Sequence, residues 1–154
     1  TMFVGVFILL SALPSGWLTD HFGRKRIVAW AGLLAAAGTA LAVAVPNLTV
    51  IYLGGCIIET GMGLFYTANW ALGTEIVPKE EAGRFLGISN LAGAGAGAIG
   101  AYIGGPMADF LSAQLPQTPA MGYVILFAIY GVLFLLSMVA LSRVRETPRV
   151  SDPV

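Results

Sequence analysis

Charge is scarce in this chain, and that scarcity excludes the usual soluble classes. Only 10% of the 154 residues are Asp, Glu, Lys or Arg, while 57% are hydrophobic. Soluble domains carry roughly 45–50% apolar and about 25% charged residues, so water is not the main solvent of this protein. The formal net charge is zero, which offers no electrostatic footprint for nucleic acid. We therefore expect no nucleic-acid partner.

Residues that form disulfides, metal sites and catalytic dyads are nearly missing from the sequence. The single cysteine, Cys56, excludes an internal disulfide and lies in an apolar run, where a packed thiol is expected. The single histidine, His21, lies in a charged connection. The sequence has no metal-ligand cluster and no spacing of a nucleophile with a base. We expect no enzyme activity, no cofactor and no metal.

Five long stretches are almost free of charge, with Glu59 as the one exception. Each is close to the ~20 residues that a helix needs to cross ~30 Å of hydrocarbon. They occupy Met2–Leu18, Ile27–Val45, Val50–Gly73, Phe85–Gly105 and Met121–Leu141. The predicted fold class is an all-α membrane protein with five transmembrane helices. Residues 1–142 would form the helical bundle and residues 143–154 a cytoplasmic tail.

Lys and Arg are absent from two of the connections between these stretches. The segments 46–49 and 106–120 hold neither residue, whereas all eight basic residues lie in 24–26, 79–84 and the tail. Loops rich in Lys and Arg remain cytoplasmic. We therefore predict a cytoplasmic carboxyl end, an external amino end, and a place in the plasma or inner membrane. Thr1 opens directly into an apolar run, so we also expect upstream helices of the same protein.

A charged island, Gly16-Trp-Leu-Thr-Asp20-His-Phe-Gly23-Arg24-Lys25-Arg26, follows the first stretch. Glycine suits a tight reversal at Gly23, and Gly16 would let a neighbouring helix approach closely. Asp20 opposes the local positive charge, which indicates a specific partner, whereas Lys25 and Arg26 could simply anchor the loop. The island resembles the G-x-L-x-D-x-x-G-R-[RK]-[RK] signature of the major facilitator superfamily of secondary transporters. The resemblance implies a cytoplasmic gate motif formed by Gly16, Asp20, Gly23, Arg24 and Lys25.

The resemblance covers the whole chain and favours the second half of the superfamily fold, helices eight to twelve. The fourth helix of the first half often carries R-x-x-Q-G-x-G, but here Ile57 and Thr60 stand at the Arg and Gln positions. The order Gly104-Gly105-Pro106 also differs from the antiporter signature G-P-x-x-G-G. The sequence therefore gives no support to drug–proton antiport.

The third stretch carries the strongest functional signal. An ionisable side chain near the bilayer centre costs about 2.5–3.5 kcal/mol and is a functional-site hypothesis by default. Glu59, Gly63, Tyr66 and Trp70 share one helix face, with Asn69 beside it. We predict that these five residues line the path of a small solute or of a coupling proton or cation. The alternative is a protonated Glu59 that makes a structural hydrogen bond.

The remaining stretches are interpreted as scaffold. The fourth contains G-x-x-x-G spacings, which let helices approach closely, so we expect it to pack against another helix. The second and fifth stretches have little polarity and are expected to face lipid. The glycines assigned to helix packing are Gly93, Gly97, Gly100 and Gly104, with Gly95 between them.

The sequence thus predicts transport of a small solute by alternating access, as part of a secondary active symporter or uniporter. The other expected partners are the lipid bilayer and the upstream helices. A different class stays open: an integral membrane interaction or assembly subunit, in which Glu59 pairs with a basic residue of a partner. An integral membrane enzyme is a weaker third interpretation.

Overall fold

The chain is described by a computed structural model that covers residues 2–45, 47–115, 118 and 120–144. Within these residues the chain forms five α-helices, one 3-10 turn and no strand. The elements are α1 (Met2–Phe22), α2 (Arg24–Ala44), α3 (Leu48–Ile76), η1 (Lys79–Glu81), α4 (Ala82–Gln114) and α5 (Met121–Ser142). In the described part of the chain, the four helices α2 to α5 are long and apolar enough to cross a membrane. The predicted all-α membrane fold is confirmed.

The first helix runs farther than the sequence suggested, because the charged island is itself helical. The helices α1 and α2 include every residue from 2 to 44 except Gly23. That glycine has φ 93° and ψ 142°, a region that residues with a Cβ rarely adopt. The predicted reversal at Gly23 is therefore confirmed, and it takes a single residue.

Prolines in the sequence explain where α2 and α3 end. The residue before a proline is pushed toward extended backbone, and both Val45 and Val77, which precede Pro46 and Pro78, have extended dihedrals. The next helix, α3, starts after Asn47, whose side-chain oxygen accepts a hydrogen bond from the Thr49 amide at 2.8 Å. This is the usual N-cap arrangement of asparagine.

The fourth helix corrects the predicted boundary at Gly105. It continues through Pro106 to Gln114, which makes it 33 residues long, or about 50 Å at 1.5 Å per residue. Membrane helices tolerate an internal proline because neighbouring groups satisfy the freed backbone. Packing also supports this end of α4, since a Cβ at Gly122 of α5 would collide with the Ala108 carbonyl and with Ser112.

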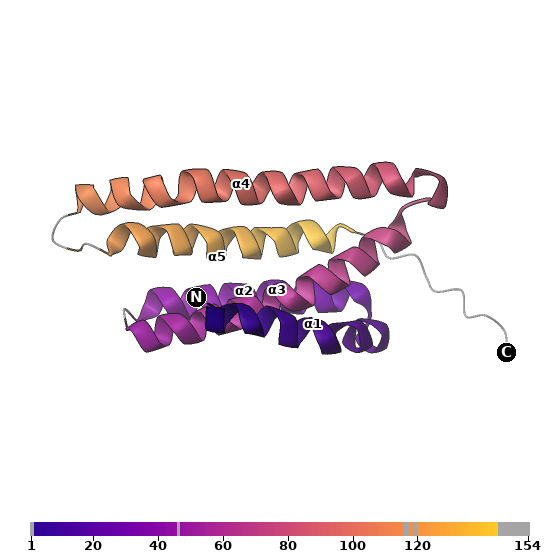
Figure 1. Ribbon diagram of the computed structural model, residues 1–154, viewed down its shortest axis with the longest axis horizontal. Coiled ribbons are helices and arrows are strands. Elements are labelled where there is room, and N and C mark those ends of the chain that lie inside the picture. Colours follow the sequence, from indigo (N-terminus) through magenta and orange to yellow (C-terminus); the bar gives the residue numbers. More distant parts are fainter. Residues whose placement is uncertain (1, 46, 116–117, 119, 145–154) are drawn as a thin grey trace.

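The helices form two groups (Figure 1). The helices α1, α2 and α3 pack together, and α5 lies between this group and α4. The core is made by Ile27, Val28 and Ala31 of α2 against Leu64, Ala68 and Leu72 of α3. The second stretch was expected to face lipid; α2 contacts α1, α3 and α5 on one side, and Trp30 and Leu33 on its other side are 46% and 48% exposed. Small buried residues of α2, such as Ala31, Ala35 and Gly38, allow the neighbouring helices to pack closely against it.

The glycines of α4 are only partly covered by other helices. The Tyr130 hydroxyl of α5 would lie 2.8 Å from a Cβ at Gly104 and 4.0 Å from one at Gly100. A Cβ at Gly93, Gly95 or Gly97 meets nothing within 4 Å in the described structure. The predicted packing role is thus seen at one end of the stripe, against α5.

The connections alternate between two ends of the molecule (Figure 1). The Gly23 turn, the α3–α4 connection and the end of α5 lie at one end, with Arg24, Lys25, Arg26, Arg84 and Arg143. We call this the basic end. The α2–α3 and α4–α5 connections lie at the opposite end. Residues 145–154 of the expected tail, with Arg145 and Arg149, lie outside the described residues.

Candidate functional site

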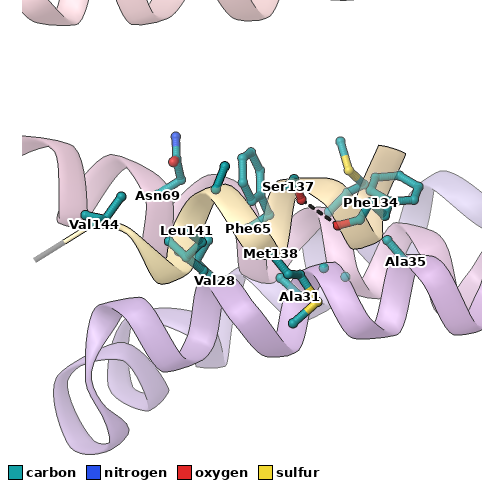
Figure 2. Close-up of a pocket in the computed structure, with 14 residues that line it drawn as sticks. Val28, Ala31, Ala35, Phe65, Asn69, Phe134, Ser137, Met138, Leu141 and Val144 are labelled. Atoms are coloured by element: carbon teal, nitrogen blue, oxygen red, sulfur yellow. Dashed lines mark hydrogen bonds between the residues drawn. The ribbon is translucent and has the colours of Figure 1, made fainter. Parts of the chain in front are cut away.

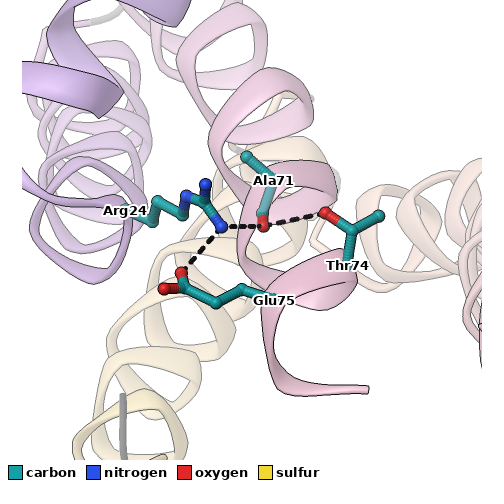
Figure 3. Close-up of polar contacts among 4 residues, drawn as sticks. All are labelled: Arg24, Ala71, Thr74 and Glu75. Carbon is teal, nitrogen blue, oxygen red and sulfur yellow. Dashed lines mark hydrogen bonds and ion pairs between the residues drawn. The ribbon is translucent and has the colours of Figure 1, made fainter. Parts of the chain in front are cut away.

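An ion pair joins α2 to α3 at the basic end (Figure 3). The Arg24 guanidinium donates to the Glu75 carboxylate at 2.7 Å and to the Ala71 carbonyl at 2.9 Å. The hydroxyl of Thr74 also donates to that carbonyl, at 3.0 Å. Both charged side chains are largely covered, with exposed fractions of 26% and 21%. Arg24 therefore connects the α1–α2 turn to the last turns of α3.

A second contact joins the same turn to α5. The Lys25 ammonium donates to the carbonyls of Ser142 and Val144 at 3.3 and 2.6 Å. These carbonyls lie at the end of α5, where helix carbonyls have no intrahelical partner. Two residues of the predicted gate motif, Arg24 and Lys25, thus contact the ends of two other helices. Asp20 lies exposed on the last turn of α1.

Among the described helices, no neighbour makes the close approach to Gly16 that the sequence predicts. A Cβ at Gly16 would meet nothing within 4 Å in the described structure, so no neighbouring backbone requires a glycine there. The close approach of α1 to α3 instead involves Gly63 of α3, which faces the part of α1 around Ser11. A Cβ at Gly63 would collide with the side chain of Ser11 and the carbonyl of Ile8.

Hydroxyl groups line the α1 side of this contact. Ser11, Ser15 and Thr19 are spaced by four residues on α1, and all three are buried. The Ser15 hydroxyl donates to the Leu64 carbonyl of α3 at 3.2 Å. Small polar residues at helix interfaces in membranes allow close packing and hydrogen bonds between helices. Gly63 therefore makes room for α1 rather than for a solute.

Glu59 lies half-buried on α3, on the wall of a cleft of about 300 Å³. The cleft is also lined by Gly5 of α1, Ala42 of α2, Tyr52 of α3 and Phe127 of α5. Among the described residues, no hydrogen-bond donor or cation contacts the Glu59 carboxylate. A carboxylate in this position can accept hydrogen bonds from a solute.

The other residues predicted for the path lie in different surroundings. Tyr66 and Trp70 are 58% and 47% exposed, on the face of α3 that carries Glu59. Asn69 instead lines a second groove between α2, α3 and α5 (Figure 2). The structure therefore separates Asn69 and Glu59 into two hollows. In the residues that the structure covers, no cluster of three His, Cys, Asp or Glu side chains could hold a metal ion.

Glu75 is the polar residue that the sequence analysis missed. No charge bias marks it in the sequence, because the segment 75–84 holds three acidic and two basic residues, and its pairing with Arg24 is seen only in the structure. The burial of Ser11, Ser15 and Thr19 was also not foreseen, although their four-residue spacing places them on one helix face.

Comparison with known proteins identifies the family. The model of the Major Facilitator Superfamily matches residues 1–154. The chain belongs to this superfamily. The match agrees with the structure, in which the signature Gly16–Arg26 joins two helices by a one-residue turn at the basic end. The protein is therefore an integral membrane protein.

Several curated members of the superfamily resemble the chain. The minor myo-inositol transporter IolF of Bacillus subtilis is 29% identical over 138 residues, which are 90% of this chain and 30% of that protein. The galactose-proton symporter of Escherichia coli K12 is 32% identical over 95 residues, 61% of this chain and 20% of that protein. The niacin transporter NiaP of Acinetobacter baylyi is 34% identical over 84 residues, which are 54% of this chain and 19% of that protein. The chain thus spans about a third or less of these relatives, and no solved structure matches it.

Proposed function

We propose that the chain forms part of a secondary transporter that moves a small solute by alternating access. The half-buried Glu59 on the wall of a cleft within a membrane span carries this proposal. An ionisable group at such depth is expensive and marks solute or ion pathways. Membership of the superfamily and the named activities of the relatives support the same conclusion.

The five helices correspond, in this proposal, to helices eight to twelve, with the basic end and the carboxyl end in the cytoplasm. The positive charge at one end supports this orientation. Rocking of this half against another half would then open the solute site to each side in turn. The Arg24–Glu75 pair and the Lys25 contacts would hold the cytoplasmic ends of α2, α3 and α5 together when that side is closed.

A neutral polyol or sugar fits Glu59 better than an anion does. Hydroxyl groups donate hydrogen bonds to a carboxylate, whereas the carboxylate of niacin would be repelled by it. Inositol and galactose, which two relatives are named for, are rich in such donors. We therefore place a polyhydroxylated solute ahead of a carboxylate solute, with proton coupling at Glu59.

The test is uptake of radiolabelled myo-inositol and galactose by the complete protein in proteoliposomes, with and without a proton gradient. Glu59→Gln preserves shape and hydrogen bonding but cannot titrate. We expect this variant to lose gradient-driven accumulation and to retain counterflow of the same solute. Glu80→Gln, which neutralises an exposed carboxylate in the α3–α4 connection, is the matched control and should behave as the wild type.

Two outcomes would contradict the proposal. Unchanged accumulation by Glu59→Gln, at equal protein level and across a range of pH, would leave Glu59 with only a structural hydrogen bond. Absence of uptake and counterflow for any small solute would instead favour the assembly-subunit interpretation.

A further inference from the structure

Two tyrosines flank Glu59 on the same face of α3. Tyr52 precedes Glu59 by seven residues and Tyr66 follows it by seven, and a spacing of seven keeps all three side chains on one face of a helix. Both tyrosines are well exposed, at 46% and 58%. Spacing alone therefore does not show which aromatic ring shares a site with the carboxylate.

The packing of α1 decides between the two tyrosines. One turn from Glu59 in the direction of Tyr66, α3 carries Gly63, and this position is covered by the side chain of Ser11 from α1. In the direction of Tyr52 the cleft of about 300 Å³ lies open, and Tyr52 lines it together with Glu59. The structure thus assigns Tyr52 to the surroundings of the carboxylate.

Glycines leave room for a ligand between this ring and the carboxylate. Gly55 lies between Tyr52 and Glu59 along α3 and also lines the cleft. Gly5 of α1 lines it too, and a Cβ added there would meet nothing within 4 Å. Within the described part of the chain, the Tyr52 side chain has no hydrogen bond and no contact with another aromatic ring. Its ring is therefore not engaged by a neighbouring polar or aromatic group.

An aromatic ring beside a carboxylate matches the two kinds of surface on a cyclic polyol. The hydroxyl groups of the polyol donate hydrogen bonds to the carboxylate. Its axial C–H groups form an apolar face, which packs against the face of an aromatic ring. An axial hydroxyl interrupts that apolar face, so the contact depends on the stereochemistry of the solute.

We propose that Tyr52 is a specificity-determining residue of the solute site. Its ring stacks on the C–H face of a cyclic polyol, while hydroxyl groups of the same molecule bind Glu59. This inference rests on the proposed function, because it concerns the same cleft. It adds that the site selects solutes with an uninterrupted face of axial C–H groups.

Stereoisomers of inositol test this selection, because they carry the same number of hydroxyl groups. The complete protein, purified in detergent, is assayed for binding of tritiated myo-inositol by scintillation proximity, with unlabelled isomers as competitors. The isomer scyllo-inositol has no axial hydroxyl, whereas allo-inositol has axial hydroxyls on both faces. We expect scyllo-inositol to compete at an about three- to tenfold lower concentration, the range that one aromatic contact supplies.

Matched variants separate the ring from the rest of the site. Tyr52→Leu should remove most of the difference between the two isomers, whereas Tyr52→Phe, which keeps the ring, should preserve it. Tyr102→Leu is the control, since it removes an 86% exposed tyrosine of α4 that does not line the cleft. This variant should retain the isomer preference of the wild type.

Three results would overturn this inference and leave the proposed transport function intact. Equal competition by the two isomers in the wild type would show that no C–H face is recognised. An unchanged isomer ratio in Tyr52→Leu would show that another helix or lipid covers Tyr52 in the complete protein. Loss of the ratio in Tyr52→Phe would show that the hydroxyl, not the ring, sets the selectivity.

A different result would reach further. Absence of displaceable binding by any inositol in the wild type would overturn both this inference and the polyol assignment on which it rests.

Discussion

Arg24 illustrates how one side chain can connect two helices, α2 and α3, next to a chain reversal. Its guanidinium reaches both a carboxylate and a backbone carbonyl of α3, while its backbone opens α2 directly after the Gly23 turn. Hydrogen bonds to charged groups are about twice as strong as neutral ones. Two charge-assisted hydrogen bonds, in addition to apolar packing, therefore hold the Gly23 turn against the end of α3.

A double-mutant cycle tests this coupling. In the complete protein, Arg24→Gln and Glu75→Gln should each lower thermal stability, and the double variant should lose less than the sum. We expect a coupling free energy of about 1 kcal/mol, typical of contacting charged residues. Arg24→Gln should be the more damaging single change, because it also removes the bond to the Ala71 carbonyl. The measurement is thermal unfolding in detergent, followed by tryptophan fluorescence.

Glu80→Gln is again the control, since Glu80 is exposed in the neighbouring connection. Strictly additive losses from Arg24→Gln and Glu75→Gln would contradict the ion pair. Faster alkylation of a cysteine at the basic end in Glu75→Gln would in addition support the gate role.

Among the helices, the closest approach of α2 to α3 depends on glycine. A Cβ at Gly38 would lie 2.6 Å from the Gly54 carbonyl oxygen, and a Cβ at Gly54 would lie 2.6 Å from the Gly38 carbonyl oxygen. Each glycine thus makes room for the backbone of the other helix. This pair lies between α2 and α3, the two helices that form the core. The glycine-rich stretch of α4, in contrast, is mostly uncovered in the described structure.

Alanine substitution distinguishes these two kinds of glycine. Gly38→Ala should destabilise the complete protein by about 1–3 kcal/mol, because the added methyl meets backbone that cannot move alone. Gly97→Ala should be neutral or slightly stabilising, because alanine is the better helix former by about 1 kcal/mol. Thermal unfolding in detergent measures both. An equal loss for Gly97→Ala would show that another segment covers that face of α4 in the complete protein.

For the molecule as a whole, the arrangement of the connections predicts which side reagents can reach. Cysteines that replace Asn47 and Thr118 would lie in the α2–α3 and α4–α5 connections, and a cysteine that replaces Glu80 would lie in the α3–α4 connection. A membrane-impermeant maleimide added outside intact cells should label the first two and not the third. Cys56, the single native cysteine, is buried and should add little background.

Labelling of all three positions from outside would contradict the predicted topology. Labelling of Glu80→Cys alone would indicate the opposite orientation in the membrane, with the same alternation of the connections between its two sides. Permeabilised cells, in which all three sites should react, control for accessibility.

Elements that depend on local chemistry could be predicted from the chain alone. Long apolar runs must become helices in lipid, since each backbone group needs a partner within its own segment. Gly23, Pro46 and Pro78 mark chain reversals through their own backbone restrictions. The charged residue within a span was likewise readable, because such groups are rare in hydrocarbon, whereas the gate motif was predicted from its resemblance to a family signature.

Contacts between helices required the folded structure. Apolarity does not distinguish a helix face that contacts lipid from one that contacts other helices, since both surroundings lack water. The contacts of α2 with α1, α3 and α5 could therefore not be predicted. The same ambiguity hid the roles of Gly38 and Gly63, which only the crossing of two backbones reveals. Nor could spacing along α3 show that Asn69 and Glu59 belong to separate hollows, because α1, α2 and α5 form the walls between them.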